Sequence, residues 1–148
     1  MPLIKSISGF RGTIGGRPDA GLTPVDIVKL TSAFICLIRR AGVKRPRIVV
    51  GRDGRLSGTM VNQLVCGNLQ AMGADVIDIG LSTTPTVEVA VTEMKADGGV
   101  ILTASHNPRE WNALKLLNNK GEFISKTDGE WLLEKAATDD YEFSNIDE

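Results

Sequence analysis

The sequence predicts an α/β domain of three layers, α/β/α, built on a mixed, mostly parallel sheet with an antiparallel edge strand. Two observations support this prediction. Short apolar or β-branched runs alternate with longer segments whose apolar residues recur at helical spacing, an order typical of parallel strands joined by helices. The last strand candidate follows the one before it too closely for a crossover helix, so we expect it to run antiparallel at the edge of the sheet.

The N-terminal part of the chain predicts a strand, a loop and a helix. Residues 3–7 are expected to form a short strand, and the glycine-rich residues 8–16 a loop. A helix is expected after Thr23, because threonine caps helices and Pro24 suits the first helical position. Apolar residues then recur at helical spacing until Gly42 ends the run.

The middle of the chain predicts the first parallel unit. Residues 47–50 form a β-branched run typical of a buried strand, and residues 51–55 follow as a polar, glycine-containing loop. Ser57 is placed to cap the next helix, which Gly73 ends. Residues 75–79 are expected to return as the next strand.

The remaining elements complete the predicted sheet. Thr84 and the proline after it open a third helix, and residues 99–102 form the next strand. Residues 114–117 are the antiparallel strand candidate, with residues 122–124 placed to pair back as a hairpin. A capping box that begins at Thr127 precedes the last helix.

Length and composition indicate one folded domain. The chain has 148 residues, of which 42% are hydrophobic and 24% charged, values typical of a globular protein with an apolar core. We expect residues 1–137 to form this domain. Residues 138–148 are acidic and lack periodicity, so we interpret them as a linker or a truncated end that leads to a second domain missing from this chain.

Composition also excludes several classes of function. The net charge of −1 argues against nucleic acid as a partner, and no apolar run is long enough for a membrane helix. The N-terminus does not resemble a signal peptide, so we expect a cytoplasmic protein. Cys36 and Cys66 are expected to be buried free thiols, and a zinc site is unexpected because His106 is the single histidine.

Two polar loops follow predicted strands of the sheet. Ligands of open α/β sheets bind beyond the carboxyl ends of the strands, which is where residues 51–55 and 103–111 are placed. The second loop brings the hydroxyl of Ser105, the imidazole of His106 and the carboxamide of Asn107 side by side and then includes a proline. This loop is the first candidate for a functional site.

The surroundings of Ser105 favour phosphoryl chemistry over acyl transfer. No G-x-S-x-G turn surrounds Ser105, and adjacent side chains such as that of His106 point to opposite faces of an extended chain. A phosphoserine instead needs cations or a metal beside its oxygens. The loops and their neighbours supply four cationic side chains: Arg11, Arg52, Arg55 and Lys115.

Four segments carry a resemblance to a known family. Residues 103–108, TASHNP, resemble the phosphoserine signature of the α-D-phosphohexomutase superfamily, and residues 51–55, GRDGR, resemble a second segment of it. Residues 8–12, SGFRG, are similar to the family's N-terminal segment except at Phe10, and residues 112–115, NALK, match a fourth segment except at Ala113. The resemblance therefore identifies this chain with the first domain of the phosphoglucomutase, phosphomannomutase and phosphoglucosamine mutase superfamily.

The resemblance implies roles for individual residues. Ser105 would carry the phosphoryl group, and Arg11 and Lys115 would lie beside it and stabilise its charge. His106 would act in proton transfer or substrate contact, so that the general base is either His106 or Lys115. The remaining residues implied at the phosphate or the substrate are Ser8, Arg52 and Asn107. A salt bridge between Arg52 and Asp53 that shapes the loop is the alternative for Arg52.

The resemblance also implies cofactors and partners. Mg²⁺ would bind an oxygen of the Ser105 phosphate together with aspartates of a second domain, whose metal loop this sequence lacks. The substrate would be a hexose 1-phosphate or 6-phosphate and the activator a hexose 1,6-bisphosphate. We therefore expect the chain to be inactive without the remaining domains. The alternative is a non-catalytic phosphosugar-binding or partner-docking domain, which would not need the combination of Ser105, Arg11 and Lys115.

Overall fold

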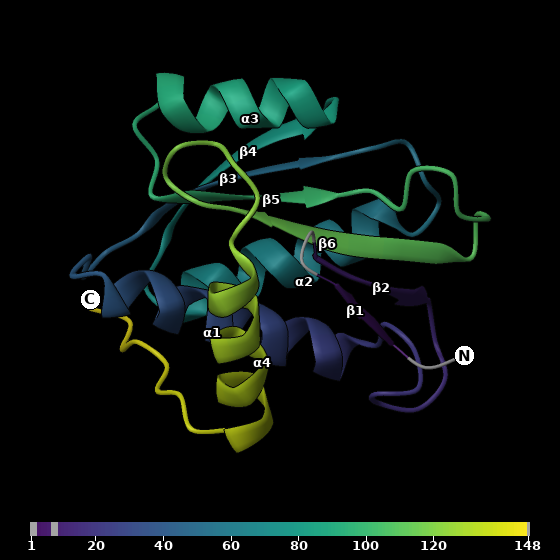
Figure 1. The fold of residues 1–148 in the computed structure, drawn as a ribbon, viewed down its shortest axis with the longest axis horizontal. Coiled ribbons are helices and arrows are strands. Elements are labelled where there is room, and N and C mark those ends of the chain that lie inside the picture. The colour runs from purple at the N-terminus through teal and green to yellow at the C-terminus, as the bar shows by residue number, and fades with distance from the viewer. Residues whose placement is uncertain (1–2, 7–8, 148) are drawn as a thin grey trace.

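The computed structural model describes residues 3–6 and 9–147 and folds them around one sheet (Figure 1). The strands are β1 (Ile4–Ser6), β2 (Gly9–Thr13), β3 (Arg47–Arg52), β4 (Asp75–Leu81), β5 (Gly98–Leu102) and β6 (Trp111–Leu117). The helices are α1 (Pro24–Arg40), α2 (Gly58–Ala71), α3 (Thr84–Glu93) and α4 (Lys126–Thr138). This order confirms the predicted α/β class.

The sheet is mixed, with the strand order β1-β2-β6-β5-β3-β4. Strand β3 runs parallel to both β4 and β5, as the alternation of strands and helices predicts. The other three pairings, β1 with β2, β2 with β6 and β5 with β6, are antiparallel. The sheet has the predicted antiparallel edge strand, but this strand is β1: β6, where the sequence placed that edge, is interior because β1 and β2 extend the sheet beyond it.

Strand β2 arises from a segment that the sequence predicted as a loop. Its Phe10 is only 1% exposed and packs in the main core, while Gly9 fits where the chain passes very close to β6. A Cβ atom at Gly9 would lie 2.2 Å from the carbonyl oxygen of Leu114, so a side chain has no room there. The glycine that suggested a loop therefore serves close strand packing.

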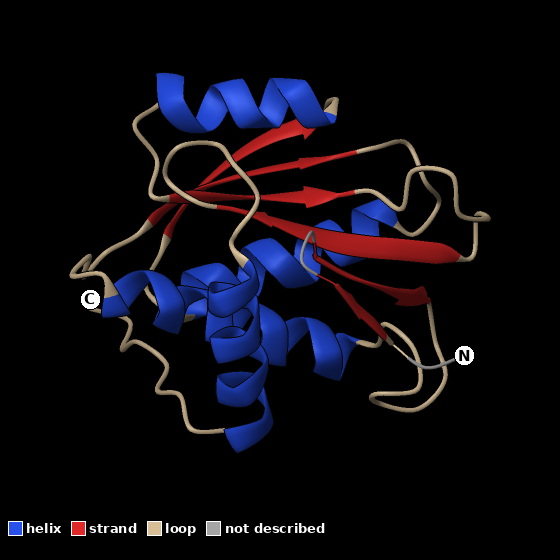
Figure 2. Ribbon diagram, in the orientation of Figure 1, coloured by secondary structure: helices blue, strands red, loops and turns tan. Residues whose placement is uncertain are grey.

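Helices cover both faces of the sheet, which confirms the three layers. Helix α3 lies alone on one face, against β3 and β5, and helices α1, α2 and α4 cover the other (Figures 1 and 2). All five residues of β5 are buried, as expected of a central strand between two helical layers. No helix in the described part of the chain is long and apolar enough to cross a membrane.

Helix capping agrees with the sequence at α1 and differs at α2 and α4. The side chain of Thr23 accepts a hydrogen bond from the amide of Asp26, whose carboxylate accepts one from the amide of Thr23, so the two complete a capping box. Ser57 precedes α2 without a side-chain cap, and its hydroxyl accepts a hydrogen bond from Asn112 instead. Helix α4 is capped by Ser125 and contains Thr127, where the sequence predicted the cap.

The C-terminal segments lie against the domain. The predicted hairpin after β6 is reduced to an isolated antiparallel bridge between Leu117 and Phe123. Beyond α4, the side chain of Tyr141 packs against the main core, and the amide of Ser144 donates a 2.8 Å hydrogen bond to the carbonyl of Ala71. The domain limit at residue 137 and the linker character of residues 138–148 stay predictions.

Candidate active site

A pocket of about 200 Å³ opens at the end of the sheet where β5 finishes and β6 begins. Its lining brings together all the residues to which the resemblance assigns catalysis, along with Asn107. The lining residues are Arg11, Ala104, Ser105, His106, Asn107, Ala113 and Lys115. The small, buried side chains of Ala104 and Ala113 leave space between the longer polar groups. Arginine and lysine without a carboxylate in this lining make the pocket suitable for an anion.

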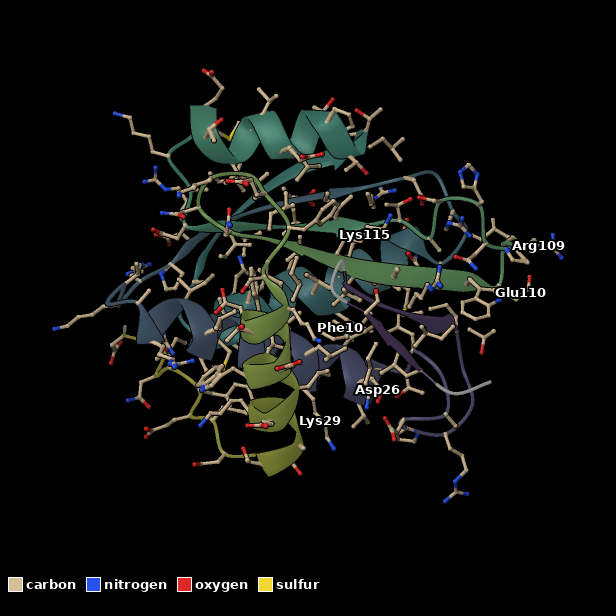
Figure 3. The ribbon with its side chains drawn as sticks, viewed as in Figure 1. Phe10, Asp26, Lys29, Arg109, Glu110 and Lys115 are labelled. Carbon is tan, nitrogen blue, oxygen red and sulfur yellow. The ribbon has the colours of Figure 1, made fainter. Side chains whose placement is uncertain are left out.

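Strand pairing places Arg11 and Lys115 on one face of the sheet. Arg11 of β2 lies directly opposite Ala113 of β6 in the antiparallel register. Side chains two residues apart on a strand point to the same face, so Ala113 and Lys115 share that face with Arg11. Figure 3 labels Lys115 along β6, and Arg109 and Glu110 on the loop that precedes this strand.

Ser105 lies within hydrogen-bond distance of Lys115. The Nζ atom of Lys115 is 3.2 Å from the Oγ atom of Ser105, so the ammonium group donates to the hydroxyl oxygen. Ser105 is exposed, which leaves this oxygen accessible. Its backbone φ of 48° lies in the left-handed region, which costs a residue other than glycine on the order of 1 kcal/mol. Residues held in such conformations cluster at functional sites.

Arg55 holds the loop that carries Ser105, and the sequence analysis assigned it no such role. Its guanidinium donates hydrogen bonds to the carbonyl oxygens of Ser105 at 2.8 Å, Pro108 at 2.8 Å and Trp111 at 3.1 Å. Its Nε atom also pairs with Asp53 at 3.1 Å. The sequence signal was the Asp-x-Arg spacing in the loop after β3, but the backbone acceptors lie 50 or more positions away along the chain.

One predicted phosphate-site residue, Arg52, is absent from the pocket lining, and another is not described by the structure. Ser8 lies outside the described residues. Arg52 ends β3 beside the start of α2, where its side chain approaches Gly58. The proposed salt bridge between Arg52 and Asp53 is corrected, because Asp53 forms its ion pair with Arg55.

This chain does not by itself assemble a metal site among its described residues. No group of three or more carboxylate, imidazole or thiol side chains is placed to hold a metal ion there. The nearest carboxylate in the loop after β3, Asp53, already accepts hydrogen bonds from Arg55 and Thr103.

Comparison with known proteins gives concordant matches. Residues 4–143 match the family model described as phosphoglucomutase/phosphomannomutase, alpha/beta/alpha domain I. The chain is 44% identical over 117 residues to a phosphoglucomutase/phosphomannomutase of Thermococcus kodakarensis, which covers 78% of this chain and 26% of the relative. It is 34% identical over 135 residues to a probable phosphoglucosamine mutase of Methanosphaera stadtmanae, covering 91% of this chain and 28% of the relative.

A solved structure shares the fold. The crystal structure of a putative phosphomannomutase from Thermus thermophilus superposes with a TM-score of 0.80 at 28% identity, over 92% of this chain and 30% of that one. The chain thus spans about a quarter of the length of the curated relatives it matches.

Proposed function

The chain belongs to the phosphoglucomutase/phosphomannomutase family as its alpha/beta/alpha domain I, and from this premise we propose that Ser105 carries the phosphoryl group of a phosphohexose mutase. The proposed reaction interconverts the 1-phosphate and 6-phosphate of a hexose through a bisphosphorylated sugar. The observation that supports it is the 3.2 Å contact between Lys115 Nζ and Ser105 Oγ, in a pocket that Arg11 also lines.

The proposed chemistry moves phosphoryl groups between oxygen atoms. The phosphoryl group on Ser105 Oγ passes to the free hydroxyl of a hexose monophosphate, so that the Oγ–P bond breaks and a sugar O–P bond forms. The resulting bisphosphate returns its other phosphoryl group to Ser105 and leaves as the isomeric monophosphate. In the first step the attacking sugar hydroxyl gives up its proton and the departing Ser105 Oγ gains one. In the second step Ser105 gives up its proton and the departing sugar oxygen gains one.

The cations of the pocket have a physical role in this scheme. Phosphoryl transfer depends mainly on positioning and on stabilising the charge of the transferring group. In the proposed scheme Lys115, whose Nζ lies 3.2 Å from Ser105 Oγ, stabilises negative charge on that oxygen, and Arg11, which lines the same pocket, binds other phosphoryl oxygens. His106 lines the same pocket and is the second candidate, with Lys115, for the proton transfers.

The complete activity is proposed for a longer protein. Because the chain spans about a quarter of its curated relatives, we propose that further domains complete the sugar site and that this domain is inactive without them. Mg²⁺ would bind an oxygen of phosphorylated Ser105 and carboxylates of another domain, where its charge would offset that of the phosphate. Hexose 1,6-bisphosphate would load Ser105, and we propose the cytoplasm as the location.

A non-catalytic phosphosugar-binding domain is the alternative function. Binding alone needs cations such as Arg11 and Lys115 but no accessible hydroxyl oxygen. The Lys115 contact is made to that hydroxyl, which favours the enzyme.

Phosphate transfer to Ser105 tests the proposal directly. The full-length protein is incubated with glucose 1,6-bisphosphate, and the peptide that contains Ser105 is analysed by mass spectrometry. We expect one phosphate on Ser105, none at this position after Ser105→Ala, and slower loading after Lys115→Met. The control Ser125→Asn changes a serine outside the pocket and keeps a helix-capping residue. Mutase activity that survives Ser105→Ala would contradict the proposal.

A further inference from the structure

A closed ring of hydrogen bonds runs through the backbone of Ser105. The ring joins Arg55, Asp53 and Thr103 to both polar backbone groups of Ser105. We propose that Arg55 is a positioning residue which, through this ring, holds Ser105 in the left-handed conformation that directs its hydroxyl toward Lys115. The expected effect on phosphoryl transfer rests on the proposed function, but the restraint of the loop by the ring can be tested separately.

Arg55 forms the first arm of the ring and reaches the Ser105 loop at three points. Its Nη2 atom donates to the carbonyl oxygen of Ser105 at 2.8 Å, and its Nη1 atom donates to the carbonyl oxygens of Pro108 and Trp111. The side chain of Arg55 is only 11% exposed, although its bonds to the carbonyl groups of Ser105 and Pro108 lie at the surface. A single planar group thus binds two carbonyl groups of the loop and that of Trp111, the first residue of β6.

Asp53 and Thr103 form the second arm. One carboxylate oxygen of Asp53 accepts from Arg55 Nε at 3.1 Å and from the hydroxyl of Thr103 at 2.7 Å. The hydroxyl oxygen of Thr103 in turn accepts from the amide of Ser105 at 3.2 Å. The ring therefore returns to the residue from which it started.

The ring is anchored in the rigid centre of the sheet. The amide of Asp53 donates to the carbonyl of Leu102, the last residue of β5, at 3.1 Å. Arg55 and Asp53 follow β3, and Thr103 follows β5, so two adjacent parallel strands carry the ring. A loop held from two core strands keeps one conformation where an unsupported loop would relax.

The conformation of Ser105 explains why such support is needed. A φ of 48° is unfavourable for serine, so the residue should leave this conformation when its carbonyl and amide are released. Rotation of this backbone would carry Oγ away from Lys115. Because Arg55 is absent from the pocket lining, its effect on transfer would come through the loop.

The donor geometry makes a lysine variant the sharpest test. Lysine keeps the charge, but its compact ammonium group cannot reproduce the planar fork that serves three carbonyls and Asp53. Arg55→Lys should therefore lower the rate of Ser105 phosphorylation at saturating glucose 1,6-bisphosphate by about 10- to 100-fold. The bisphosphate concentration for half-maximal rate should stay within about twofold, because no pocket residue has changed.

A second variant and a matched control guard against a simple loss of folding. Thr103→Val keeps the shape of the side chain but removes the acceptor for the Ser105 amide, and should slow phosphorylation as well, while Thr103→Ser should not. Arg45→Gln is the control, because Arg45 forms an ion pair of the same 3.1 Å length with Asp75, between exposed side chains near the opposite ends of the strands. This control should leave the phosphorylation rate unchanged.

Hydrogen–deuterium exchange in the full-length protein measures how firmly the ring holds the loop, and it does not depend on phosphoryl transfer. Arg55→Lys and Thr103→Val should each raise the exchange rate of the peptide covering residues 103–111 at least about threefold, and Arg45→Gln should not. If both variants keep wild-type exchange and wild-type phosphorylation, the positioning role is wrong. If exchange rises but the wild-type protein takes no phosphate on Ser105, the ring is supported and the proposed function is the part that fails.

Discussion

Ser105 combines exposure of its hydroxyl with restraint of its backbone. Its side chain is open to the pocket, while its amide and carbonyl are both hydrogen-bonded within the loop. A group that must exchange a phosphoryl with a ligand needs that access, and it also needs a fixed position relative to the cation beside it. Lys115 meets the second need from a neighbouring strand, at 3.2 Å.

Single residues were predictable to different degrees. The hydroxyl of Ser105 stood out because a core strand does not require it, whereas Arg11 and Lys115 were singled out among four cations only by the family resemblance. Arg55 was recognised as a cation beside a loop, but its role depends on carbonyl oxygens of residues 105, 108 and 111, which a sequence pattern does not display. Backbone acceptors carry no residue-type signal, so only the tertiary structure reveals such a partner.

Cys66 gives a prediction about pH at the scale of one residue. Burial, followed by the negative charge of Asp78, raises the pKa of this thiol from 9.0 to about 11. Near pH 8 the folded chain should therefore react with iodoacetamide at Cys66 roughly 100-fold more slowly than the denatured chain, because only the thiolate reacts. Peptide mass spectrometry of a Cys36→Ser variant, which leaves Cys66 as the single cysteine, measures this rate.

The raised pKa of Cys66 also makes the stability of the folded state depend on pH. A pKa that folding raises stabilises the folded state below the unfolded value and ceases to do so as pH rises through the folded value. The contribution of Cys66 should thus be present below pH 9.0 and be lost as pH rises toward about 11. If iodoacetamide labels Cys66 at the same rate in the folded and the denatured chain, the pKa of this thiol is not raised by folding.

Strand β2 is the element that differs most from its sequence pattern. Two of its five residues are glycine, which favours a loop, yet it pairs on both sides with β1 and β6. Its register sets Arg11 opposite Ala113 and so brings a cation to the pocket that the Ser105 loop borders. This glycine-rich segment forms a strand because Gly9 allows it to lie close against β6 and because its one large apolar side chain, Phe10, is buried in the core.

Gly9→Ala tests this interpretation of β2. The new Cβ atom would lie 2.2 Å from the Leu114 carbonyl oxygen and 2.8 Å from the Lys115 Cα atom, and the residue has a φ of 146°. We expect the free energy of unfolding to fall by roughly 2–4 kcal/mol, as measured by denaturant titration. Displacement of β2 should also weaken phosphate binding in the pocket, since Arg11 would move.

Gly67→Ala is the matched control for that measurement. Gly67 lies within α2, and a Cβ atom there would meet no other group within 4 Å. Alanine in a helix should raise stability by up to about 1 kcal/mol. Equal effects at Gly9 and Gly67 would mean that close packing against β6 does not select glycine in β2.

At the scale of the whole molecule, the two helical layers leave one end of the sheet open. Helix α3 covers one face and the other helices the opposite face, while the loops after β3 and β5 meet at the uncovered carboxyl ends (Figure 2). Loops in this position bring residues distant in the sequence together without being part of the core. The pocket forms there because β6 and β2 add their side chains to those of the loop.

The C-terminal segment provides a test of the domain limit. Tyr141 packs against the main core and Ser144 is hydrogen-bonded to α2, so residues beyond 137 make contacts whose contribution to stability can be measured. Truncation after Thr138 should lower the free energy of unfolding by roughly 1–3 kcal/mol, and Tyr141→Ala should account for much of that loss. Ile146→Ala, at a side chain 99% exposed, should stay within about 0.5 kcal/mol. An unchanged stability after truncation would support the predicted domain limit at residue 137.

The sequence by itself determined the α/β class, the three layers and the candidate nucleophile. These follow from periodicity and from residue types that a core does not use, both of which are local properties of the chain. Only the tertiary structure decided that a glycine-rich segment is a strand, that β6 is interior, and that Arg55 rather than Arg52 pairs with Asp53. Those outcomes depend on which segments lie side by side, because pairing partners and backbone acceptors far along the chain leave no local pattern.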